Sequence, residues 1–72
     1  ERLMAQFKYK DIVLDWVQES GLHLIRLRGD NHTKVLYSGP NMGQASKVFR
    51  ETQAHYEQQE REEKARKLTL VN

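Results

Sequence analysis

The sequence predicts a small α+β domain in the order helix, β-hairpin and long C-terminal helix. Residues 39–68 carry the longest helical periodicity, and two apolar runs flank a turn-forming segment at residues 29–33. The chain has 72 residues, of which 38% are hydrophobic, which suits one domain with a thin core. We therefore expect residues 1–72 to form a single small domain.

Residues 1–20 are compatible with either a helix or a strand. The apolar residues that fit helical spacing are Tyr9, Ile12, Val13, Trp16 and Val17. Gly21 follows them, at a position where a left-handed residue commonly ends a helix. This pattern predicts a helix over about residues 8–20, with Asp11 and Asp15 on its polar face beside Lys8 and Lys10.

The alternative for the same residues is a β-strand. Ile12, Leu14 and Trp16 would then share one face, and residues 19–21 would form a turn. The fold would be a three-stranded β-meander followed by the long helix.

Residues 22–28 and 34–38 are predicted to form a β-hairpin. The segment between them, GDNHT, is rich in residues that tolerate positive φ or form local turn hydrogen bonds. Arg26 and Arg28 are two residues apart, so they point to the same side of the strand. We expect helices to cover one face of the hairpin and to leave this basic face open.

The long helix is predicted to begin after Pro40, with Asn41 as its N-cap. Its apolar stripe consists of Met42, Ala45, Val48, Phe49, Thr52 and Tyr56. Phe49 and Tyr56 are expected to pack with Trp16 in the core. The stripe ends near residue 57, so residues 57–72 are expected to project or fray, and the apolar tail at residues 68–71 could be an extra strand, a contact with a second copy or a disordered end.

Positive charge gathers on the predicted hairpin and favours a nucleic-acid-binding function. Residues 22–40 contain three Lys or Arg residues and one Asp, whereas the helix mixes both signs. The predicted binding residues are Arg26, Arg28, His32, Lys34 and Tyr37. Tyr37 would stack on a base if it lies on the outer face and would join the core if it points inward. The partner would be DNA or RNA.

The alternative function is a protein–protein interaction module or a homodimer. A thin core and an overlong amphipathic helix both favour a protein partner, which would use the apolar stripe and the apolar tail. No apolar run reaches the length of a membrane span, and we expect a cytoplasmic protein with no membrane contact.

The sequence offers little for catalysis, metal binding or a cofactor. It has no Cys, and its three His residues, His23, His32 and His55, lie at spacings that match no metal-site motif. The corner at residues 39–43 lacks the Lys-Ser/Thr pair of a phosphate-binding loop. We therefore predict a binding module that is not an enzyme and has no metal or cofactor.

The run from Lys10 to Lys34 combines a predicted helix, a Gly, a basic strand and the sequence Gly29-Asp30-Asn31-His32. It resembles the opening of small RNA-cleaving toxins of the HicA type and covers about a third of the chain. The resemblance implies a layout like that of a double-stranded-RNA-binding domain, with a turn histidine, here His32, acting in RNA cleavage. The following strand is short, the Pro-x-His segment of that family is absent, and the long charged helix is foreign to it.

Overall fold

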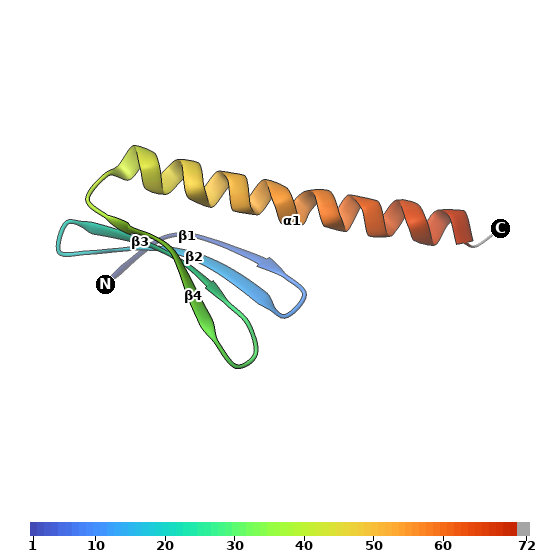
Figure 1. The fold of residues 1–72 in the computed structure, drawn as a ribbon, viewed down its shortest axis with the longest axis horizontal. Helices are drawn as coiled ribbons and strands as arrows, with labels where there is room; N and C mark the ends of the chain where they lie inside the picture. Colours follow the sequence, from blue (N-terminus) through green and yellow to red (C-terminus); the bar gives the residue numbers. More distant parts are fainter. Residues whose placement is uncertain (71–72) are drawn as a thin grey trace.

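The computed structural model describes residues 1–70 as an antiparallel β-meander followed by one long helix (Figure 1). The elements are β1 (Arg2–Tyr9), β2 (Ile12–Glu19), β3 (Leu22–Arg28), β4 (Thr33–Gly39) and α1 (Met42–Leu70). The four strands are hydrogen-bonded in the order of the sequence, β1-β2-β3-β4. Residues 1–70 thus form a small α+β domain with one sheet and one helix.

The predicted helix over residues 8–20 is wrong, and the alternative, a β-meander, is correct. These residues form the end of β1, a two-residue turn and β2. β2 carries apolar side chains on both of its faces: Leu14 packs toward α1, whereas Val13 and Val17 point to the opposite face. This pattern also fits the spacing of a helix, which is why a helix was predicted. Because this helix is absent, the layout implied by the resemblance to RNA-cleaving toxins is absent as well. The strand β1 was not predicted.

The turn between β2 and β3 explains why Gly21 misled the prediction. Ser20 and Gly21 have φ values of 52° and 80°, and they join the cross-strand pair Glu19 and Leu22. Positive φ at both central residues is the geometry of a type I′ hairpin turn. Gly21 therefore adopts the expected left-handed conformation, but it closes a hairpin and does not end a helix.

The core lies between α1 and one face of the sheet. Leu14 and Ile25 from the sheet are buried against Ala45 and Phe49 of α1. The ring of Trp16 packs against this cluster, with its centroid 6.1 Å from that of Phe49. Of the predicted helical stripe, Ala45, Val48 and Phe49 pack in or against the core, which confirms Phe49 as a core residue, whereas Met42 is exposed.

The start of α1 is fixed by a side-chain cap. The backbone N–H of Gln44 donates a hydrogen bond of 2.9 Å to Oδ1 of Asn41, which confirms Asn41 as the N-cap. At its other end the helix extends past the sheet (Figure 1). Leu68 is part of α1 and is exposed, so the predicted tail does not begin as a fifth strand, and residues 71–72 lie outside the described residues.

A polar contact joins the C-terminal half of α1 to the end of β1 and the turn that follows it. Oε1 of Glu63 accepts hydrogen bonds of 2.7 Å from the hydroxyl of Tyr9 and from Nζ of Lys10. The bonds from Lys10 and Tyr9 lower the pKa of Glu63, and the bond to Glu63 raises the pKa of both Lys10 and Tyr9. This contact and the ring of Tyr56, 5.5 Å from that of Tyr9, hold α1 over the end of β1.

Candidate nucleic-acid interface

The two faces of the sheet differ in whether α1 covers them. One face packs on α1, and we call the opposite one the open face. Arg26 pairs across the strands with Asp15, and Leu27 pairs with Leu14, so Arg26 lies on the open face and Leu27 on the helix side. Lys34 in β4 pairs with Leu27 in β3 and therefore also lies on the helix side. The structure thus places Arg26 and Lys34 on different faces.

A buried carboxylate organises the arginines of the open face. Asp15 is only 2% exposed, and its Oδ2 lies 2.7 Å from Nε of Arg28 and 3.6 Å from an η nitrogen of Arg26. Its Oδ1 accepts a hydrogen bond of 2.7 Å from Gln6. A carboxylate this well covered stays charged only if it is paired and hydrogen-bonded, and these three partners supply both conditions.

Asp15 was not recognised as a site residue from the sequence. A helix would have placed it on a solvated surface, whereas the strand places it between Val13 and Val17 on one face. The signal that could have revealed it is this apolar flanking at a spacing of two residues. Its carboxylate offsets one of the two positive charges of Arg26 and Arg28, so the open face is less basic than the sequence suggested.

A hollow of about 230 Å³ lies at the end of the β3–β4 hairpin, and we call it the hairpin hollow. The lining residues with cationic or imidazole side chains are Arg28, His32 and Lys34, although the guanidinium of Arg28 is bound to Asp15 on the open face. Its apolar and aromatic lining comes from Ile12, Leu27 and Tyr56. The fold therefore brings three of the five predicted binding residues together around one apolar surface.

The loop that carries His32 is closed on itself. The N–H of Gly29 donates a hydrogen bond of 2.9 Å to the carbonyl oxygen of His32. This bond places His32 between Arg28 at the end of β3 and Lys34 near the start of β4. The spacing of these three residues is thus fixed by the backbone of the hairpin.

Tyr37 does not lie with the arginines. It packs against the core on the helix side, and its hydroxyl accepts a hydrogen bond of 3.2 Å from the N–H of Asn41. The inward alternative for Tyr37 is therefore correct. The aromatic residue of the hairpin hollow is Tyr56, which was expected in the core. Its contact with the hairpin could not be predicted, because this contact depends on how α1 crosses the sheet.

His23 and His55 do not contribute to the hollow. His23 is buried, and its Nδ1 accepts a hydrogen bond of 3.1 Å from Nε1–H of Trp16. His55 is exposed on α1, where its ring packs edge-on against Tyr56. Within residues 1–70 no group of three or more His, Asp or Glu residues is placed to hold a metal ion.

Comparisons with protein-family models, curated proteins and solved structures find no match to this chain. No helix among the described residues is long and apolar enough to cross a membrane.

Proposed function

We propose that this protein is a non-enzymatic module that binds single-stranded nucleic acid at the hairpin hollow. The observation that carries the proposal is that one hollow is lined by Arg28, His32 and Lys34 together with Tyr56 and two aliphatic residues. Cationic side chains beside an aromatic ring are the combination that proteins use for single strands, because the cations attract phosphates and the ring stacks on a base.

The size and lining of the hollow favour an unpaired nucleotide over a duplex. A base must be unstacked before its face can contact Tyr56, and in a duplex that face is covered by the neighbouring base pairs. Contacts to phosphates and to the face of a base carry little sequence information. The proposed binding is therefore tolerant of sequence and sensitive to salt.

Lys34 gives the cleanest test because it is exposed and makes no ion pair with any described residue. The Lys34→Ala variant should bind fluorescent oligonucleotides more weakly, and its salt slope should fall by roughly one unit because one phosphate contact is lost. Fluorescence anisotropy with single- and double-stranded DNA and RNA at two salt concentrations measures both quantities. We expect single strands to bind more tightly than duplexes.

The matched control is Lys47→Ala, which removes the same charge from an exposed position on α1 that does not line the hollow. The control should bind as tightly as the unaltered protein. Equal losses in the two variants would mean that only net charge matters, and an absence of binding at low salt would refute the proposal.

A further inference from the structure

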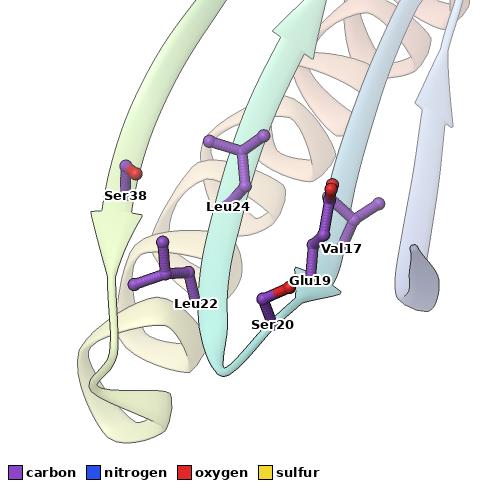
Figure 2. A pocket seen from close by; sticks show the side chains of 6 residues that line it. All are labelled: Val17, Glu19, Ser20, Leu22, Leu24 and Ser38. Atoms are coloured by element: carbon purple, nitrogen blue, oxygen red, sulfur yellow. The ribbon is translucent and has the colours of Figure 1, made fainter.

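A second hollow lies on the open face, on the side of the sheet away from α1, and its chemistry differs from that of the hairpin hollow. It has a volume of about 210 Å³ and lies over the strands at the end that carries the turn between β2 and β3 (Figure 2). Its lining consists of Val17, Glu19, Ser20, Leu22, Leu24 and Ser38. Figure 2 shows these side chains on β2, β3, β4 and the adjoining turn, with α1 behind the strands.

Large apolar side chains remain exposed around this hollow. Leu22 is 49% exposed, and Leu3 and Val35, from the two edge strands, are 55% and 54% exposed. Register and alternation place all three on the open face. A sheet with an apolar face needs a second layer to cover it, and the only helix of the described chain covers the other face.

We infer that a second copy of this chain covers the open face, with a two-fold axis that runs along the strands between β2 and β3. Such an axis places β2 of one copy over β3 of its partner. Val17 and Leu24 are cross-strand neighbours, so Val17 faces the partner's Leu24 and Leu24 faces the partner's Val17. Apolar residues of the two sheets then face one another, as in a β-sandwich.

The same axis matches the charges. Asp15 and Arg26 are also cross-strand neighbours, so their ion pair in one copy lies over the same pair in the other, with opposite charges in register. Asp15 is covered within each chain, whereas the side chain of Arg26 is 26% exposed, so Arg26 is the member of the pair that meets the partner.

Other occupants fit less well. The residues that line the second hollow include one acid, Glu19, and no cation, so phosphates of nucleic acid or of a lipid surface are not attracted to it.

The test is the mass in solution, measured by sedimentation equilibrium on the full chain. The unaltered protein should sediment at twice its chain mass of 8.5 kDa in the micromolar range. Leu22→Glu should reduce this to one chain mass, because under the proposed axis Leu22 faces the partner's Glu19 and two carboxylates would meet. Leu22→Lys places the opposite charge at the same position, where it would meet the partner's Glu19, and should remain a dimer.

Two further variants control for folding and for the choice of surface. Val35→Glu lies on the same face and should also dissociate the dimer, while circular dichroism should show that each variant keeps its fold. Leu68→Glu alters the exposed end of α1 and should leave the dimer intact. The inference would be overturned if the unaltered protein were monomeric, or if Leu22→Glu and Leu22→Lys had equal effects. It would also be overturned if Leu68→Glu dissociated the dimer while Leu22→Glu remained dimeric.

Discussion

At the scale of single residues, Asp15 has three side-chain partners. It sits at the middle of the sheet, where it holds Gln6, Arg26 and Arg28 in fixed positions on the open face. Arg28 also lines the hairpin hollow, but its guanidinium is bound to Asp15 on the open face, whereas Lys34 and Leu27 lie on the helix side. Asp15 therefore holds the charge of one lining residue on the open face.

Removal of the Asp15 carboxylate should destabilise the fold. Asp15→Ala leaves two arginines and an amide without their buried partner, but the arginines are partly exposed and can be rehydrated. We expect a loss of about 2–3 kcal/mol in the free energy of unfolding, measured by urea denaturation. Asp11→Ala, which removes an exposed turn carboxylate, is the control. If the two variants unfold at the same urea concentration, Asp15 does not hold the sheet together.

At the scale of secondary-structure elements, the hairpin and the long helix could be predicted from the sequence because their signals are local. A turn-forming segment between two apolar runs identified β3 and β4, and Asn41 marked the start of α1. The first two strands could not be predicted with the same success. Apolar residues on both faces of β2 fit two periodicities, and only the pairing with β1 and β3 selects the strand.

The candidate site was predictable only in part, for a related reason. Charge counting found Arg28, His32 and Lys34, because a short hairpin loop keeps neighbours in sequence close in space. Tyr56 lies more than twenty residues away along the chain, and its place beside the hairpin depends on the direction in which α1 crosses the sheet. Such a long-range contact has no signal in a single sequence.

The docking of α1 on the first hairpin should depend on pH. The pKa of Glu63 is lowered from its ordinary value of 4.5, so its stabilising contact is present above that value and is lost as the pH falls through the lowered pKa. The pKa values of Tyr9 and Lys10 are raised from 10.0 and 10.5, so their contribution is present below pH 10.0 and is lost as the pH rises through the raised values. The contact should thus persist across the neutral range.

Glu63→Gln tests this prediction. The variant should melt at a lower temperature than the unaltered protein at neutral pH, and the difference should shrink in strongly acidic solution, where Glu63 is protonated in the unaltered protein as well. Thermal melts followed by circular dichroism measure both effects. Glu51→Gln, an exposed position elsewhere on α1, should change little at either pH. A difference between Glu63→Gln and the unaltered protein that does not change with pH would show that the charge of Glu63 is unimportant.

At the scale of the whole molecule, one helix on one sheet leaves two distinct surfaces. The hairpin hollow opens where the β3–β4 hairpin meets α1, and it is basic and aromatic. The hollow on the open face lies over the β2–β3 end of the sheet, and it is apolar with a single acid. Since the first depends on cations and an aromatic ring and the second on apolar burial, nucleic-acid binding and self-association can be tested independently.

The proposed binding of single-stranded nucleic acid at the hairpin hollow is tested by titrating the ¹⁵N-labelled protein with a short unlabelled oligonucleotide and following the amide chemical shifts. We expect the largest shifts at Gly29, His32, Lys34 and Tyr56, with small changes at Leu22 and Leu24 on the open face. Shifts confined to the open face, or no shifts at low salt, would contradict the proposed binding site.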